Sequence, residues 1–246
     1  MNWLEVGALG LFAGVIGTGA GGLLSVLIKK PTPRFTGTIL AFAAGVMLSI
    51  IFLELIEEAI ETSGYTAAVV GLALGMAVFY LLDHYLPHHH PVSVEETPFG
   101  GYLRKGTLLA LGIALHNFPE GLAIGTGYVG SPELGLSLAI LIGLHNVPEG
   151  MAVAAPLKQG GYGFARVLLI TAMAGVPMGI GALIGAAIGS ISDLVLGLSF
   201  GFAAGAMLYI VCDELIPDAY ESAGAHLSIF GIFTGTILGI LIIAWL

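Results

Sequence analysis

Apolar residues run along this chain in long stretches that short polar turns separate. About 20 consecutive apolar residues are enough for a helix to cross a bilayer. The pattern predicts eight such helices, at residues 5–27, 35–61, 65–86, 106–128, 133–157, 165–190, 193–219 and 226–246. The longest polar stretch, residues 87–105, predicts a loop that contains three histidines. We therefore expect an all-α integral membrane protein, with residues 1–246 forming a single transmembrane domain.

An internal repeat relates the first three predicted helices to the last three. The stretch FAAGVMLSIIFLELIEEAIETSG at 42–64 recurs as FAAGAMLYIVCDELIPDAYESAG at 202–224, an offset of 160 residues. AGVIGTGAG at 13–21 likewise resembles AGVPMGIGA at 174–182, at an offset of 161 residues. Because five spans separate the copies, they cross the membrane in opposite directions. The sequence thus predicts an inverted repeat around a central pair of helices, an arrangement that places a substrate near the midplane in secondary transporters.

The basic residues fix an expected orientation. With eight spans, all seven fall on one side of the membrane: Lys29, Lys30, Arg34, Arg104, Lys105, Lys158 and Arg166. Basic loops face the cytoplasm. We therefore expect a prokaryotic plasma membrane protein with both termini outside and the loop 87–105 inside.

The composition argues against a soluble domain, nucleic-acid binding and disulfide stabilisation. The chain is 57% hydrophobic and 9% charged, whereas soluble domains are about one quarter charged. Seven basic residues and a net charge of −9 argue against binding nucleic acid. The single cysteine, Cys212, excludes an internal disulfide.

Polar groups interrupt the fourth and fifth predicted helices at matched positions. The fourth contains ALHNFPEGLA at 114–123 and the fifth contains GLHNVPEGMA at 143–152. His116 and Glu120 share one helix face, as do His145 and Glu149, because each pair is spaced i, i+4. An ionised group at the bilayer centre costs roughly 2.5–3.5 kcal/mol. Two imidazoles and two carboxylates at equal depth favour a site for a divalent transition metal over polar residues that only join helices.

The same motifs carry two further kinds of polar residue. Pro119 and Pro148 leave a carbonyl unpaired one turn earlier, so we expect a kink that opens a cavity. Asn117 and Asn146 either ligate through the amide oxygen or orient their neighbours.

The second and seventh predicted helices carry acidic stripes. We expect the deeper members to line a transport pathway, with a solvated helix end as the alternative for the outer ones; the pathway candidates are Glu54, Asp213, Glu214 and Asp218. Met47 offers a thioether that either ligates a soft metal or fills a gap in the packing. The histidines at 88–90 suit loose metal binding in the loop.

Together the motifs HNFPEG, HNVPEG, FAAGVML and DELIPDA resemble the ZIP (Zrt/Irt-like) metal transporters, in particular their bacterial and archaeal branch. The resemblance covers essentially the whole chain. It implies uptake of Zn²⁺, and also of Fe²⁺, Mn²⁺, Co²⁺ or Cd²⁺, into the cytosol by a homodimer that has no cofactor and is not an enzyme. It implies these metal ligands: His116, Asn117, Glu120, His145, Asn146, Glu149 and Met47.

One position departs from the two-metal members of that family, which carry a glutamate before a proline in the sixth helix. Here the stretch reads AMAGVPMG, with Val176 at that position, so we expect one metal ion per site. The alternative function is an intramembrane metal-dependent hydrolase, because the same side chains suit activation of a water. The missing H-E-x-x-H motif and the inverted repeat favour transport.

Overall fold

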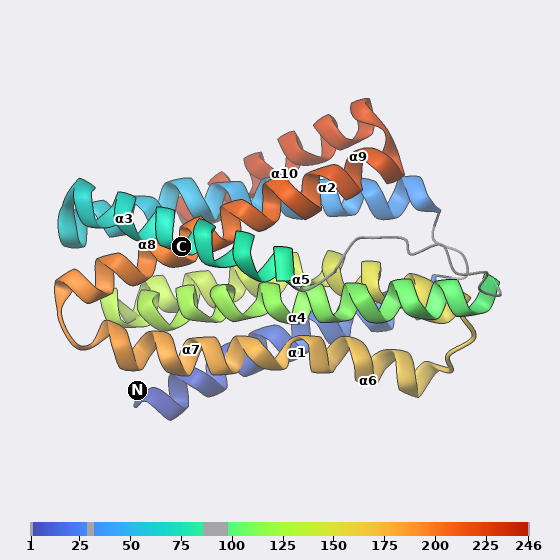
Figure 1. The fold of residues 1–246 in the computed structure, drawn as a ribbon, viewed down its shortest axis with the longest axis horizontal. Coiled ribbons are helices and arrows are strands. Elements are labelled where there is room, and N and C mark those ends of the chain that lie inside the picture. The colour runs from blue at the N-terminus through green and yellow to red at the C-terminus, as the bar shows by residue number, and fades with distance from the viewer. Residues whose placement is uncertain (1, 29–31, 86–97, 246) are drawn as a thin grey trace.

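The computed structural model describes residues 2–28, 32–85 and 98–245, and every element in them is helical. Figure 1 shows the helices lying side by side along the long axis of the molecule. In chain order they are α1 (Trp3–Leu27), α2 (Pro33–Ile50), η1 (Ile51–Leu55), α3 (Ile56–Tyr85), α4 (Pro98–Gly130), α5 (Pro132–Gln159), α6 (Phe164–Ala174), α7 (Val176–Gly189), α8 (Asp193–Ile210), η2 (Val211–Leu215), α9 (Ile216–Ala223) and α10 (Ala225–Trp245). The short elements η1 and η2 are π-helical turns that continue the preceding helices.

Seven helical segments among the described residues are long and apolar enough to cross a membrane. This confirms the prediction of an all-α membrane protein. One of the seven, Pro33–His84, has 52 residues, far more than one crossing requires. Gly64 interrupts it with φ 80° and ψ 167°, a conformation that favours glycine, and Figure 1 shows the chain turning back within α3.

Capping residues in the sequence mark where the helices begin. Asn2 and Glu5 form a capping box at the start of α1, and Ser131 accepts a hydrogen bond from the Leu134 amide at 3.0 Å at the start of α5. Pro132 follows as the first helical residue, where its missing N–H costs nothing. The turn between α4 and α5 is therefore short, and the two motif-bearing helices are neighbours.

Glycines let the helices approach closely around the central pair. A Cβ atom on Gly121 of α4 would overlap the carbonyl oxygen of Met178 in α7. One on Gly150 of α5 would overlap the carbonyl oxygen of Thr18 in α1. Such small residues allow backbone contact between helices in lipid. The contacts hold α7 on α4 and α1 on α5.

The outer helices pack in two further pairs, α2 with α10 and α3 with α8. Four glycines make the close approaches: Gly45 to Ile232, Gly205 to Leu72, Gly235 to Phe42 and Gly75 to Phe202. Each contact in one pair has a counterpart in the other at an offset of 160 residues.

Two element boundaries differ from the sequence expectation. The prediction of a loop is wrong for residues 98–105, because α4 begins at Pro98. The extra turns are supported by packing on the end of α5, where Leu103 lies against Gly160 and Leu157 lies against Gly106. The rest of the predicted loop, including the histidines at 88–90, lies outside the described residues.

The sixth predicted helix is divided at Gly175 into α6 and α7, with Pro177 in the first turn of α7. Gly175 contacts Gly14 of α1 directly, backbone against backbone. By contrast, α4 continues through Pro119 and α5 continues through Pro148.

Candidate metal-binding site

Three of the predicted ligands converge where α4 packs on α5. Glu120 of α4 and His145 and Glu149 of α5 each offer one ligand atom, and these atoms all lie within 4.8 Å of one another. The three side chains, which we call the central group, are at most 1% exposed. Within it, His145 Nε2 lies 2.8 Å from Glu120 Oε1. The i, i+4 spacing thus does place a histidine and a glutamate of α5 on the face that meets α4.

Glu149 has an unusual environment for a carboxylate. Both of its oxygens are buried, and neither has a hydrogen-bond partner among the described residues. A buried carboxylate without a partner is costly, and the cost falls when a cation lies beside it. The central group is therefore chemically suited to bind a divalent metal ion through imidazole nitrogen and carboxylate oxygen.

The two asparagines have different surroundings. Asn117 donates to the carbonyl oxygens of Ile113 at 2.9 Å and of Ala174 at 3.1 Å, and it accepts from Asn146 at 2.8 Å. This network ties α4 to α5 and to the end of α6.

The other end of the Asn146 amide lies 3.2 Å from both His145 Nε2 and Glu120 Oε2. As an amide N–H it donates to those atoms, and as an amide oxygen it adds a ligand for a cation. Asn146 is thus adjacent to the central group in either orientation.

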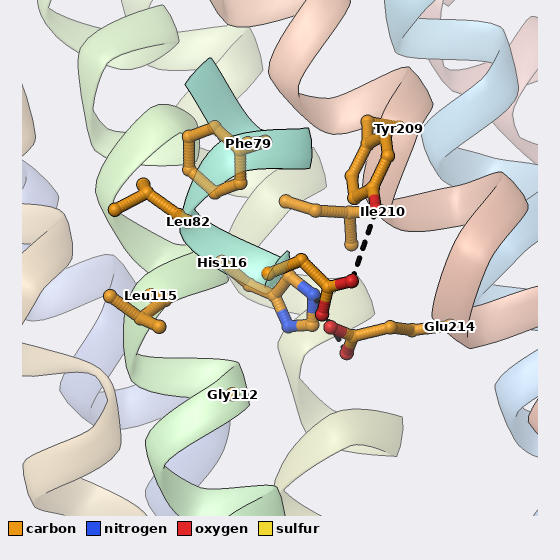
Figure 2. Close-up of a pocket in the computed structure, with 9 residues that line it drawn as sticks. Phe79, Leu82, Gly112, Leu115, His116, Tyr209, Ile210 and Glu214 are labelled. Atoms are coloured by element: carbon orange, nitrogen blue, oxygen red, sulfur yellow. Dashed lines mark hydrogen bonds and ion pairs between the residues drawn. The ribbon is translucent and has the colours of Figure 1, made fainter. Parts of the chain in front are cut away.

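His116 is 4% exposed but does not join the central group. Its Nε2 lies 3.1 Å from Oε2 of Glu214 in η2. Figure 2 shows the two side chains pointing toward each other in a small cavity. The sequence analysis expects His116 beside the other three ligands, whereas here its imidazole contacts Glu214 of η2.

A second group of carboxylates lies next to His116. Ligand atoms of Asp83, Asp213 and Glu214 lie within 4.8 Å of one another, and the Tyr209 hydroxyl donates to Asp83 Oδ2 at 3.2 Å. Asp83 is a residue that sequence reasoning missed as part of this group. No local pattern marks it, because only the packing of α3 on α8 brings it to η2.

The remaining predicted residues are not among the three side chains of the central group. Met47 of α2 is fully buried in the hydrophobic core, and Asp218 is half-buried on α9. Glu54 is half-buried in η1. It has no hydrogen-bond or ion-pair partner within the described part of the chain. Their roles in binding or transport stay predictions.

Val176 is the first residue of α7 and is half-buried. Neither α6 nor α7 contains an aspartate, glutamate or histidine. These two helices therefore supply no carboxylate or imidazole that would complete a second metal site, and one ion per site remains the expectation.

Comparison with known proteins gives consistent matches. Residues 88–244 match the family model described as ZIP Zinc transporter. The protein called Zinc transporter ZupT in Corynebacterium glutamicum is 38% identical, over 92% of this chain and 93% of its own length. The protein of that name in Chlorobium chlorochromatii is 35% identical, over 96% of this chain and 96% of its own length. The one in Stenotrophomonas maltophilia strain R551-3 is 34% identical, over 95% of this chain and 92% of its own length.

Proposed function

This chain belongs to the ZIP zinc transporter family, and from that premise we propose that its central group carries divalent metal ions across a membrane. The observation that supports this most strongly is Glu149, whose two buried oxygens lack a partner beside His145 and Glu120. A bound cation offsets the cost of the buried Glu149 charge, and that cost returns when the cation leaves. The protein is a transporter and not an enzyme.

Zinc is the substrate that the family and its named relatives support. One imidazole and two carboxylates match the ligands that Zn²⁺ takes, and the two negative charges balance its charge. We propose Fe²⁺, Mn²⁺, Co²⁺ and Cd²⁺ as further substrates, because imidazole and carboxylate also bind these ions. We further propose Asn146 and Met47 as additional ligands, and a single ion per site because position 176 is a valine.

We propose that the ion passes His116 and then the carboxylates Asp83, Asp213 and Glu214. His116 contacts Glu214 directly, and the cavity beside it is lined by Asp83, Tyr209 and apolar residues of α3 and α4. Asp218, further along the same face, continues the path in this proposal. Each step transfers the ion from one set of oxygen and nitrogen ligands to the next.

Eight spans related by an inverted repeat form the proposed architecture. The break at Gly64, with φ 80° and ψ 167°, has a counterpart at Gly224, with φ 80° and ψ 160°, an offset of 160 residues. The π-turns η1 and η2 have the same offset. The matched glycine contacts of α2 with α10 and of α3 with α8 support the same relation. Counting α3 as two segments then gives eight crossings around the central α4 and α5.

With eight crossings, both termini lie outside a plasma membrane and the segment 87–105, which includes the first turns of α4, lies inside, as the basic residues indicate. Lys158 at the end of α5 supports that side as a basic face: its Nζ donates to the Val26 carbonyl oxygen at 2.8 Å and to that of Ile28 at 3.3 Å. This cation caps the end of α1 that the proposal places in the cytoplasm. The family resemblance leads us to propose a homodimer in the lipid bilayer.

An intramembrane hydrolase has no support from the comparisons, since the relatives are named as zinc transporters. The H-E-x-x-H motif of one class of metalloprotease is also missing from the sequence. Transport accounts for the central group without this motif.

Uptake of radioactive zinc into proteoliposomes tests the proposal. The wild-type chain should show saturable uptake, and His145→Ala and Glu149→Gln should lose it. Glu133→Gln, which removes an exposed carboxylate from the same helix, is the matched control and should transport normally. An absence of zinc flux in the wild type, or full uptake by Glu149→Gln, contradicts the proposal.

A further inference from the structure

The two π-turns are equivalent in more than sequence position. In η1 the Ile56 amide donates to the Ile51 carbonyl oxygen, and in η2 the Ile216 amide donates to that of Val211. From Ile51 to Ala59 and from Val211 to Ala219 the burial of each residue follows the same order. Each turn presents one half-buried glutamate at the same place, Glu54 in η1 and Glu214 in η2. Such turns within α-helices occur often at functional sites.

The central helices are equivalent in the same sense. His116 and Glu120 of α4 recur as His145 and Glu149 of α5, with an offset of 29 residues. All four side chains are at most 4% exposed. If an axis relates η1 to η2 and α4 to α5, then a contact between His116 and Glu214 has the contact between His145 and Glu54 as its counterpart.

The contacts themselves are not symmetric. His116 contacts Glu214 at 3.1 Å and His145 contacts Glu120 at 2.8 Å. Their counterparts are absent among the described residues: Glu54 has no ion-pair or hydrogen-bond partner, and both oxygens of Glu149 lack one. The carboxylates thus fall into a set that contacts a histidine, Glu120 and Glu214, and a set that does not, Glu149 and Glu54. The proposed axis would exchange the two sets.

We propose that the two histidines exchange carboxylate partners during transport. In the opposite conformation, His116 leaves Glu214 and contacts Glu149, while His145 leaves Glu120 and contacts Glu54. This inference rests on the proposed transport function and on the inverted repeat, which relates the two conformations of such transporters. It gives Glu54 a defined role as the partner of His145.

The exchange conserves the number of contacts. Each conformation has two histidine–carboxylate contacts, and each leaves one central carboxylate and one π-turn carboxylate without a histidine partner. The two conformations therefore differ little in the cost of buried charge, which a transporter needs in order to populate both. The unpaired central carboxylate, Glu149 in this structure and Glu120 in the other, is the one left to attract the ion.

Cross-linking of engineered cysteines tests the exchange. In a Cys212→Ser background we would combine His145→Cys with Glu54→Cys, and separately His116→Cys with Glu214→Cys, and add a short bifunctional methanethiosulfonate. Both pairs should bridge, and mass spectrometry separates one bridging spacer from two single adducts. The crossed pairs, Glu54→Cys with His116→Cys and Glu214→Cys with His145→Cys, use the same four positions and should form only single adducts. Equal bridging of Glu54→Cys with either histidine position overturns the proposal.

Transport kinetics give an independent test without cysteines. Glu54→Gln should lower the maximal zinc uptake rate about tenfold, because it weakens a contact made in only one conformation. Its zinc affinity in detergent should be unchanged, since Glu54 lies outside the central group. Glu54→Asp should restore most of the rate, and Glu57→Gln, an exposed neighbour, should match the wild type.

Wild-type speed in Glu54→Gln overturns the partner exchange. If the wild type takes up zinc but His145→Cys and Glu54→Cys do not bridge, the partner exchange alone is overturned. The transport function is then unaffected. A wild type that takes up no zinc overturns the transport function itself, so the two failures are distinguishable.

Discussion

Individual carboxylates in this protein differ sharply in how well they are compensated. Glu120 contacts His145 and Glu214 contacts His116, whereas Glu149 is as buried as Glu120 but has no partner among the described residues. The cost of that charge has to be offset by something that binds there. A divalent cation does so while adding imidazole and carboxylate ligands at once.

Replacing Glu149 by glutamine should separate stability from binding. Glu149→Gln removes an uncompensated buried charge, so the zinc-free protein should melt a few degrees higher in detergent. Zinc should then no longer raise the melting temperature, because a neutral amide binds the ion more weakly than the carboxylate that it replaces. Glu133→Gln should keep the zinc-induced shift. A zinc shift of full size in Glu149→Gln would mean that the ion binds elsewhere.

Asn117 should matter for stability more than for direct ligation. Asn117→Leu leaves the Ala174 carbonyl and the Asn146 amide without their partner, which should cost about 1–3 kcal/mol. Thermal unfolding in detergent measures this. Thr107→Val, which removes an exposed hydroxyl from the same helix, is the control. An equal loss in both variants would show that the network around Asn117 contributes nothing special.

All three residues of the central group are among the ligands that the sequence predicts, because each lies in a motif that places a histidine and a glutamate on one helix at i, i+4 spacing. Sequence reasoning did not find that His116 contacts Glu214 or that Asp83 lies beside them. Those contacts join α3, α4 and η2, and their geometry depends on side-chain direction and helix packing that no local pattern encodes.

At the scale of the elements, glycine decides how closely the helices pack. Gly14 of α1 meets Gly175 at the break between α6 and α7, with backbone against backbone. Gly19, on the same helix, leaves room for a side chain, because an added Cβ would lie 3.6 Å from the Cβ of Ala172. The two positions provide a matched comparison of required and tolerant glycines.

Gly14→Ala should destabilise the protein by about 1–3 kcal/mol, because the new methyl group overlaps the Gly175 carbonyl oxygen and forces α1 away. Gly19→Ala should be neutral or slightly stabilising, since alanine is the better helix former. Thermal unfolding of the two variants in one detergent makes the comparison. If Gly14→Ala unfolds at the wild-type temperature, α1 does not require this contact.

Helix existence and approximate length followed from the apolar pattern, but three local features did not. The first turns of α4 depend on Leu103 packing on Gly160, which is distant in sequence. The break at Gly175 depends on contact with α1. The π-turns at η1 and η2 lie inside apolar runs that are indistinguishable from ordinary helix by periodicity.

For the whole molecule, the offset of 160 residues gains support from structure that sequence similarity alone does not supply. Backbone breaks at Gly64 and Gly224, the two π-turns and the glycine contacts all follow it. In the proposed inverted repeat, the two segments of like structure cross the membrane in opposite directions, which favours two conformations related by the same axis.

The proposed orientation gives a direct prediction for whole cells. In a Cys212→Ser background, Ser190→Cys lies in the exposed turn after α7 and should react with a membrane-impermeant thiol reagent added outside. Gln159→Cys, exposed at the end of α5, should react only in inverted vesicles. Labelling of both positions from the same side would contradict the eight-span arrangement.

Anomalous X-ray scattering at the zinc edge, from crystals of the wild-type protein grown with zinc, tests the central claim most directly. A single strong peak between Glu120, His145 and Glu149 is the predicted result. Zinc bound elsewhere with no peak in the central group, or two fully occupied ions a bridging distance apart, would contradict it.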